Sequence, residues 1–208
     1  MKLYYKPGAC SLASHIILNE LGAPFDLEKV DTANGRTENG ADYSRISPNG
    51  YVPALQLDSG DIVTENPAIL QLLGDRATVG SLVPVAGTMA RIRLQEMLNF
   101  LSSELHKAFG PFFSGQDLTD DERANAEAGV TRRVKFIEAT LAEKPYLLGD
   151  AFSVADAYAF VVLNWSNFVG IDTSQWPHVH EYLARVQDRP SVRKAMKAEG
   201  LIGDEAAA

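Results

Sequence analysis

Residues 2–12 of the chain read Lys2-Leu3-Tyr4-Tyr5-Lys6-Pro7-Gly8-Ala9-Cys10-Ser11-Leu12. The aromatic and apolar residues at the start of this stretch predict a β-strand, and the Pro-Gly pair after them predicts a turn. Leu12, Ile16 and Ile17 then recur at helical spacing before Gly22, which predicts a helix over residues 12–21. Cys10 therefore lies in the turn between a predicted strand and a predicted helix, as in an α/β domain.

Cys10 is the only cysteine of the chain. The N–H groups at a helix start stabilise a thiolate, so we expect a lowered pKa and a reactive thiol. The alternative is a small buried apolar residue, which free cysteine often is. Without a second cysteine there is no internal disulfide, so the redox chemistry open to a reactive Cys10 is a mixed disulfide with an external thiol.

Strand and helix signals alternate over the first 77 residues. After the first helix we expect a strand over 25–30, a polar loop over 31–40, a short helix over 41–46, two strands joined by a hairpin loop over 54–57 and 62–63, and a helix over 67–75. A linker rich in Gly, Val and Pro follows over residues 78–87.

Residues 88–202 show helical patterns and no strand signal of comparable strength. Leucines spaced by 4, 3 and 4 residues mark one long helix, at Leu94, Leu98, Leu101 and Leu105. The same spacing recurs over 130–141, a capping box at Ser153–Asp156 opens a third helix, and two more helices are expected over 176–187 and 191–198. The predicted architecture is an α/β domain (1–77), a linker (78–87) and an all-helical domain (88–208).

Composition and charge narrow the classes of function. The chain is 46% hydrophobic and 22% charged, as expected for a globular protein. Its net charge of −8 argues against general binding of nucleic acid or anionic membranes. No apolar run reaches the length of a membrane span, and the first residues lack a signal-peptide pattern, so we expect a cytoplasmic protein.

An ordered set of motifs resembles the cytosolic glutathione transferases. The set comprises the strand with its Pro-Gly turn, the early cysteine, Val52-Pro53 before a strand, Thr64-Glu65-Asn66 before a helix, and the cap at Ser153–Asp156. Cys10 combined with Asn99, His106 and Lys107 is similar to the bacterial beta class. The resemblance implies a thioredoxin-like N-terminal domain, a helical C-terminal domain, a homodimer, and glutathione as co-substrate in the cleft between domains, with no cofactor and no metal.

The resemblance also implies the residues that bind glutathione. The Val52 backbone would pair with its cysteine part, Asn66 as helix N-cap would take its α-carboxylate, and Glu65 would position its amine. The family often has a lysine near position 35 that contacts the glycine carboxylate, where this chain has Gly35. Either Arg36 replaces that lysine or the contact is lost. The remaining implied contacts lie on the long helix, at Asn99, Ser103, Glu104, Leu105, His106 and Lys107, and Glu104 would reach the partner subunit's glutathione. Spacing alone favours a plainer interpretation of Asn99, Ser103 and His106, a solvated polar face.

The expected activity is conjugation of glutathione to hydrophobic electrophiles, a detoxification reaction. Cys10 and His106 are the candidate catalytic residues, with His106 hydrogen-bonding or deprotonating the bound thiol and Cys10 able to form a mixed disulfide with glutathione. Two alternatives remain: a glutathione-dependent thiol–disulfide oxidoreductase or peroxidase, and a non-catalytic carrier of apolar ligands. Four aromatic residues either line the side of the second substrate or belong to the core: Phe109, Phe112, Phe113 and Trp165.

Overall fold

The computed structural model describes residues 1–78 and 80–203. Their contacts form two compact units. Within the described residues, the first unit holds 1–78 and 188–203, and the second holds 80–187. No helix in the described ranges is long and apolar enough to cross a membrane.

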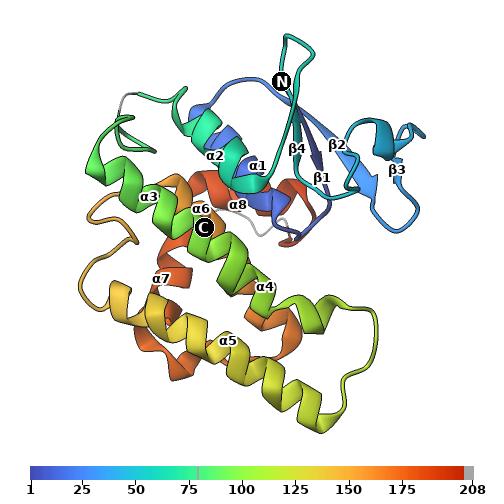
Figure 1. Cartoon of the computed structure of the whole chain (residues 1–208). Helices are drawn as coiled ribbons and strands as arrows, with labels where there is room; N and C mark the ends of the chain where they lie inside the picture. Colours follow the sequence, from blue (N-terminus) through green and yellow to red (C-terminus); the bar gives the residue numbers. More distant parts are fainter. Residues whose placement is uncertain (79, 204–208) are drawn as a thin grey trace. The chain divides into compact units, whose positions relative to one another are not determined.

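The first unit is built on a mixed sheet with strand order β3-β2-β1-β4-β5. β1 and β2 pair in parallel, whereas the other neighbouring strands pair antiparallel (Figure 1). The strands are β1 (Lys2–Tyr5), β2 (Asp26–Asp31), β3 (Arg36–Thr37), β4 (Ala54–Gln56) and β5 (Ile62–Thr64). This sheet confirms the expected thioredoxin-like fold. β3 lies inside the predicted polar loop, because two residues are too few for an alternating pattern to show.

The two faces of the sheet are covered by different elements. Alternation along β1 sends Leu3 and Tyr4 to opposite faces. On one face α1 (Ser11–Leu21) packs against β1, with α2 (Asn66–Gly74) beside it. On the other face Tyr4 packs with Tyr43, which lies in a short 3₁₀ turn (Tyr43–Arg45) where a helix over 41–46 is predicted.

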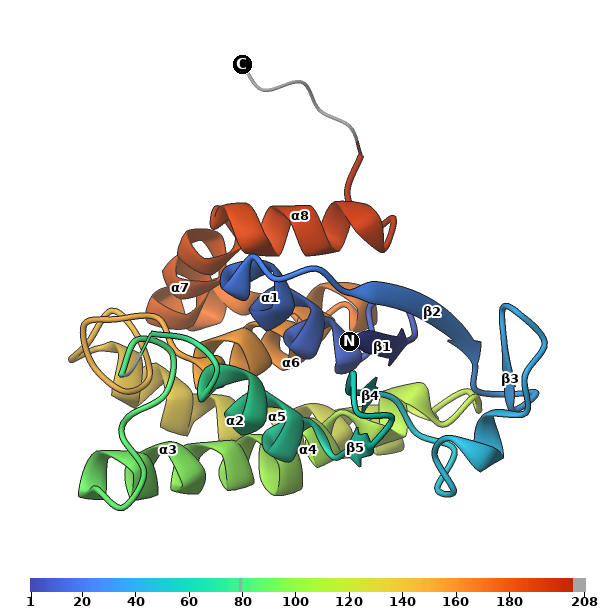
Figure 2. The same ribbon diagram turned by 90° about the horizontal axis from the view of Figure 1, so that it is seen from above.

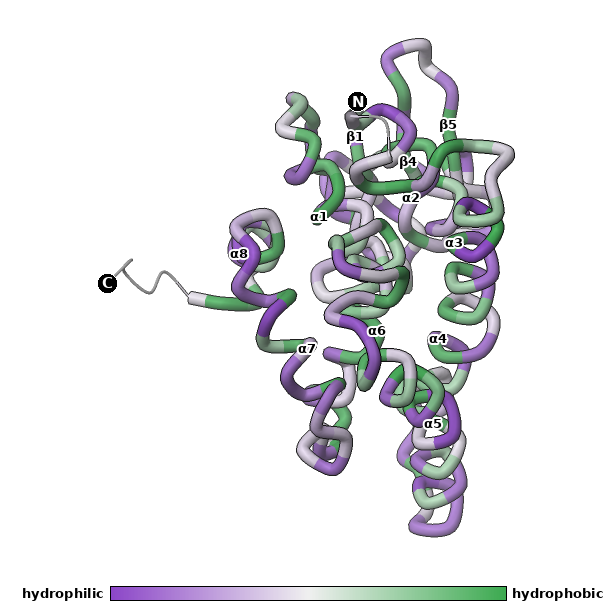
Figure 3. Tube along the Cα trace, turned by 90° about the vertical axis from the view of Figure 1, so that its left-hand side faces the viewer, coloured by the Kyte–Doolittle hydropathy of each residue, from purple (hydrophilic) through white to green (hydrophobic). Residues whose placement is uncertain are grey.

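α8 (Pro190–Ala198) belongs to the first unit, although it lies in the range predicted as the helical domain. It runs alongside α1 (Figure 2). Hydrophobic and hydrophilic residues alternate along it (Figure 3), and Val192, Ala195 and Met196 are buried. A short amphipathic helix must bury its apolar stripe, and the sequence shows the stripe without showing which element covers it.

The second unit is helical, as predicted. Its main elements are α3 (Met89–Phe100), the π-helical turn η2 (Leu101–Leu105), α4 (His106–Ala108), α5 (Asp120–Leu141), α6 (Val154–Val169) and α7 (Pro177–Gln187). The predicted leucine stripe is buried along its whole length. The capping box of α6 is present, because Asp156 Oδ2 accepts hydrogen bonds from the Ser153 N–H (2.9 Å) and hydroxyl (2.7 Å).

The π-helical turn changes the register of the long helix. The shared face predicted for Asn99, Ser103 and His106 assumed a constant 100° per residue, which a π turn interrupts. The hydroxyls of Ser102 and Ser103 both donate to the Asn99 carbonyl, at 3.1 and 2.8 Å. Side chains N-terminal and C-terminal to η2 therefore cannot be placed on one face by counting residues.

Candidate functional site

Cys10 stands immediately before α1, as expected. Its thiol donates a hydrogen bond to the carbonyl of Val52, with 3.4 Å between Sγ and O. Only a protonated thiol can donate this bond. The cysteine and the backbone implied to bind glutathione are therefore in direct contact.

The predicted lowering of the Cys10 pKa is wrong. Burial raises the pKa of the Cys10 thiol to about 12, and the carboxylate of Glu65 adds to the increase. The backbone N–H groups of Cys10 and Ser11 act in the predicted direction, but burial outweighs them. The sequence shows the helix start, but it does not show that the surrounding residues shield the thiol, although Cys10 as a whole is only half-buried.

We expect native Cys10 to alkylate slowly. A thiol with a pKa of about 12 holds about a thousandfold less thiolate at pH 8 than a thiol with a pKa near 9, so iodoacetamide should react about a thousandfold more slowly than with the unfolded chain. Intact mass against time, with the protein in urea as control, measures the ratio. Equal rates for native and unfolded protein would show that burial does not suppress the thiolate.

The segment before β4 is held by hydrogen bonds to its carbonyls. The Val52–Pro53 peptide bond is cis. The carbonyl of Tyr51 accepts from the Tyr43 hydroxyl (2.9 Å) and the Ser47 hydroxyl (3.1 Å). These bonds and the one from Cys10 fix the backbone on which the glutathione contact was predicted.

Asn66 is not the N-cap of α2, contrary to the prediction. It is the first residue of the helix, and the N-cap is Glu65, whose φ of 64° is unusual for a residue with a side chain. The Asn66 amide donates to the Cys10 carbonyl (2.9 Å), and its oxygen accepts from the Ser14 hydroxyl (2.7 Å). The Asn66 side chain thus joins α2 to α1. An anion at the start of α2 would therefore be bound by backbone N–H groups and not by the Asn66 side chain.

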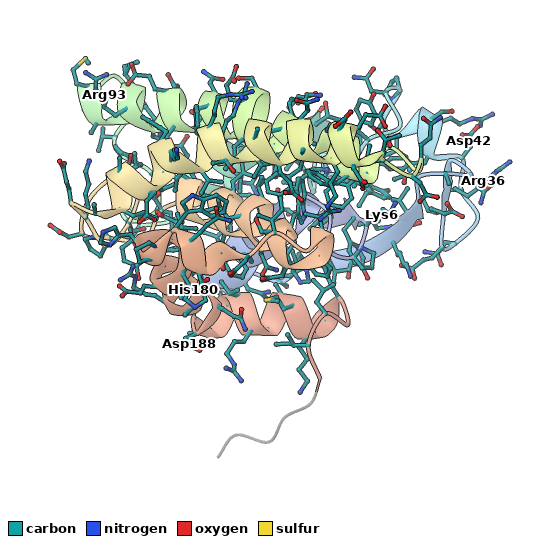
Figure 4. The ribbon with its side chains drawn as sticks, turned by 90° about the horizontal axis from the view of Figure 1, so that it is seen from below. Lys6, Arg36, Asp42, Arg93, His180 and Asp188 are labelled. Atoms are coloured by element: carbon teal, nitrogen blue, oxygen red, sulfur yellow. The ribbon has the colours of Figure 1, made fainter. Side chains whose placement is uncertain are left out.

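Arg36 stands apart from the other candidates of the first unit. It lies on the edge strand β3, and its Nη1 donates to the carbonyl of Gly40 (3.3 Å). Figure 4 shows Arg36 beside Asp42, with which it forms a β-bridge, and pointing away from the ribbon. The structure therefore brings together Cys10, Val52 and Asn66, with Glu65 adjacent in the chain, and leaves Arg36 on β3 with its bond to the Gly40 carbonyl.

In the second unit, His106 is held among aromatic side chains. Its Nδ1 lies 2.9 Å from the hydroxyl oxygen of Tyr158, and its ring meets the Trp165 ring edge-on at 4.8 Å between centroids. Burial lowers the pKa of His106 to about 4, and the charge of Lys107 contributes to this shift. The imidazole is therefore neutral at pH 7.

The other predicted residues of the long helix differ in exposure. Glu104 is paired with Arg133, whose Nε and Nη2 lie 3.2 and 3.0 Å from Oε2. Leu105 is fully buried, so its side chain is unavailable to a ligand. The remaining three are exposed: Asn99, Ser103 and Lys107.

Of the four aromatic residues that either belong to the core or line the side of the second substrate, some are buried and others are exposed. Phe109 is fully buried and belongs to the core. Phe113 is 53% exposed and contacts Trp165 edge-on at 5.3 Å, and Phe112 is half-buried. An exposed aromatic surface therefore adjoins the ring that contacts His106.

Comparison with known proteins identifies the family. Residues 8–76 match the model of the glutathione S-transferase N-terminal domain, and residues 100–190 match that of the C-terminal domain. The chain belongs to the glutathione S-transferase family. It is therefore a glutathione transferase, with glutathione as co-substrate.

Individual relatives of this glutathione transferase agree with the predicted class. It is 40% identical to the glutathione S-transferase GstA of Escherichia coli O157:H7, over 97% of this chain and 100% of that one. It is similar in structure to the beta-class enzyme of Sphingomonas chungbukensis, with a TM-score of 0.93, 47% identity, and coverage of 97% and 100%. A sphingomonad glutathione S-transferase complexed with glutathione gives a TM-score of 0.92 and 46% identity at the same coverage.

Sequence reasoning missed three residues that hold this glutathione transferase's candidate site in place. Tyr158 bonds His106, Ser14 bonds Asn66, and Glu199 accepts from the N–H of Gly8, two residues before Cys10. A signal existed for Tyr158, since a tyrosine in a buried apolar run requires a hydrogen-bond partner. The sequence does not show which partner that is.

Proposed function

We propose that this glutathione transferase conjugates glutathione to hydrophobic electrophiles, with the thiolate of glutathione as nucleophile and Cys10 protonated throughout. The observation that carries the proposal is the hydrogen bond from the Cys10 thiol to the Val52 carbonyl. A thiol with its pKa raised to about 12 is a poor nucleophile at pH 7. The attacking sulfur is then the sulfur of the co-substrate.

The residues of the first unit would bind glutathione through backbone and charge. The backbone of Val52 pairs with its cysteine part like a short added strand. The N–H groups at the start of α2 take its α-carboxylate, and the exposed carboxylate of Glu65 takes its ammonium. Arg36 binds the glycine carboxylate in exchange for its bond to the Gly40 carbonyl, because an ionic partner is the stronger acceptor.

The residues of the second unit would act on the thiol and the electrophile. His106 and Lys107 stabilise the negative charge on sulfur, and Asn99 and Ser103 hydrogen-bond the peptide. Glu104 reaches a partner subunit's glutathione after release of Arg133. The thiolate forms a carbon–sulfur bond with the electrophile, whose leaving group departs with the bonding electrons, and the thiol proton goes to solvent. Phe112 and Phe113 supply an apolar surface for the electrophile.

We expect substitutions of His106 and of Cys10 to have different effects on kcat in a conjugation assay. With an aromatic chloride as electrophile, His106→Ala should lower kcat by about 10- to 100-fold, since it removes a stabilising contact to the thiolate. Cys10→Ala should keep kcat within about threefold of the native value. Loss of conjugation in Cys10→Ala would contradict the proposal, and tight binding of apolar dyes with no turnover of any electrophile would favour a carrier.

A second candidate is glutathione-dependent disulfide exchange at Cys10. The contact between Cys10 and Val52 favours it, because a bound glutathione paired with Val52 would bring the two sulfurs together. The Cys10 thiolate would attack oxidised glutathione, forming a mixed disulfide and releasing one glutathione thiolate. Adduct formation at pH 7 as fast as in the unfolded chain, absent in Cys10→Ala, would establish this chemistry, whereas slow formation that rises with pH fits the raised pKa.

We also propose that the chain forms a cytoplasmic homodimer. Large apolar side chains are exposed in both units, with Tyr51 72% and Met89 65% exposed, as at subunit interfaces. Light scattering should give twice the mass of one chain, and cell fractionation should recover the protein with cytoplasmic markers. A monomeric mass at micromolar concentration would contradict the dimer.

A further inference from the structure

We propose that Tyr158 is a positioning residue that fixes the tautomer of His106. Its hydroxyl donates to Nδ1, so Nε2 carries the imidazole proton and acts as a hydrogen-bond donor to the glutathione thiolate. The inference deepens the proposed function and rests on the role given there to His106. It assigns His106 a donor role, where the sequence alone allows either a donor or a base.

The geometry comes entirely from the second unit. His106 opens α4, directly after the π-helical turn, and Tyr158 lies on α6. The hydroxyl oxygen lies 2.9 Å from Nδ1, and the two rings meet edge-on at an interplanar angle of 85°. Tyr158 is only 2% exposed, so its hydroxyl has little access to solvent.

The direction of the hydrogen bond follows from the chemistry of the two groups. Burial lowers the pKa of His106 to about 4, so the ring is neutral and has one N–H and one acceptor nitrogen. A phenol is the stronger donor of the pair and an imidazole nitrogen the stronger acceptor, so the favoured bond runs from the Tyr158 O–H to Nδ1. A neutral ring that accepts at Nδ1 carries its proton at Nε2.

Nε2 is the ring nitrogen left for a ligand. Among the described residues, no hydrogen bond is made at this atom, whereas Nδ1 has Tyr158. An N–H aimed at a thiolate stabilises the negative charge as it forms, without needing to gain or lose a proton. A nitrogen with a pKa of about 4 would be a weak base toward a thiol, so donation is the role that the environment of His106 supports.

NMR shifts of the imidazole nitrogens test the tautomer directly. In the native protein at pH 7, Nε2 of His106 should show the shift of a protonated nitrogen and Nδ1 that of an acceptor. In Tyr158→Phe, which keeps the ring and removes the hydroxyl, the two shifts should move toward each other as the tautomers mix. A native spectrum with the proton at Nδ1 would overturn the proposal, whether or not any variant folds.

Kinetics test the consequence for the reaction. Tyr158→Phe should lower kcat for conjugation by about three- to tenfold, as expected for loss of one neutral hydrogen bond, with KM for glutathione nearly unchanged. His106→Gln, whose amide places an N–H near the position of Nε2, should retain at least about threefold more activity than His106→Ala. A His106→Gln enzyme no more active than His106→Ala would overturn the donor role.

Two controls isolate the effect. Tyr182→Phe removes another buried hydroxyl of this unit, one that bonds Asp156, and should leave the His106 shifts unchanged. In a His106→Ala background, Tyr158→Phe should have no further effect on kcat, whereas an equal effect in both backgrounds would show that Tyr158 acts through something else. If His106→Ala alone leaves kcat unchanged, the proposed role of His106 fails, while the NMR result still decides the tautomer.

Discussion

Asp156→Ala should lower the free energy of unfolding by about 3 kcal/mol or more. The carboxylate is fully buried and accepts from the N–H groups of Leu147 and Ser153 and from the hydroxyls of Ser153 and Tyr182. Each buried donor left without an acceptor costs about 1–3 kcal/mol, and the two backbone N–H groups cannot turn to find another. The denaturant midpoint, with the slope of the transition unchanged, measures the loss.

Asp150→Ala serves as the matched control. Asp150 lies close to Asp156 in the chain, but its side chain is exposed. We expect a change within about 0.5 kcal/mol for this variant. If Asp156→Ala were no less stable than Asp150→Ala, the buried carboxylate would not be a determinant of stability.

Glu199→Ala should have the second large effect, lowering the free energy of unfolding by about 2–4 kcal/mol. Oε1 of Glu199 lies 2.9 Å from Nδ1 of the buried His15, and Oε2 accepts from the N–H of Gly8 at 2.9 Å. Truncation removes the carboxylate from the buried His15 ring and from the half-buried Gly8 N–H. Because Gly8 lies in the turn before Cys10, the variant should also alkylate faster at Cys10 than the native protein.

Lys194→Ala, an exposed position on α8, is the control for this variant. It should change neither the free energy of unfolding nor the alkylation rate of Cys10. Urea titration and intact-mass kinetics give both quantities. A Glu199→Ala protein that loses stability but keeps the native alkylation rate would show that the Glu199–Gly8 contact does not control the conformation of the turn before Cys10.

The sequence predicts what depends on local patterns. The aromatic and apolar residues of β1, the helical spacing after Cys10 and the leucine stripe ending at Leu105 each match an element of the structure. The capping box at Ser153–Asp156 was also predicted correctly, because it is formed within four residues. The family resemblance, carried by such motifs in order, is confirmed by the comparisons.

The sequence does not predict what depends on distant partners. The pKa of Cys10 is set by enclosure of its thiol, which outweighs the helix start. The side chain of Asn66 is used by Ser14 and the Cys10 carbonyl, groups more than fifty residues away in the chain. The packing of α8 on α1 is likewise a tertiary contact, and the π-helical turn before His106 departs from the constant helical spacing that the sequence pattern assumes.

In the proposed mechanism glutathione supplies the thiolate and Cys10 remains protonated. The ultraviolet absorbance of thiolates at pH 7, followed as glutathione is added to native protein and to Cys10→Ala, shows which sulfur is ionised. We predict an absorbance increase of equal size in both proteins, because the ionised sulfur belongs to glutathione. An increase that is present in the native protein and absent in Cys10→Ala would place the thiolate on Cys10 and contradict the claim.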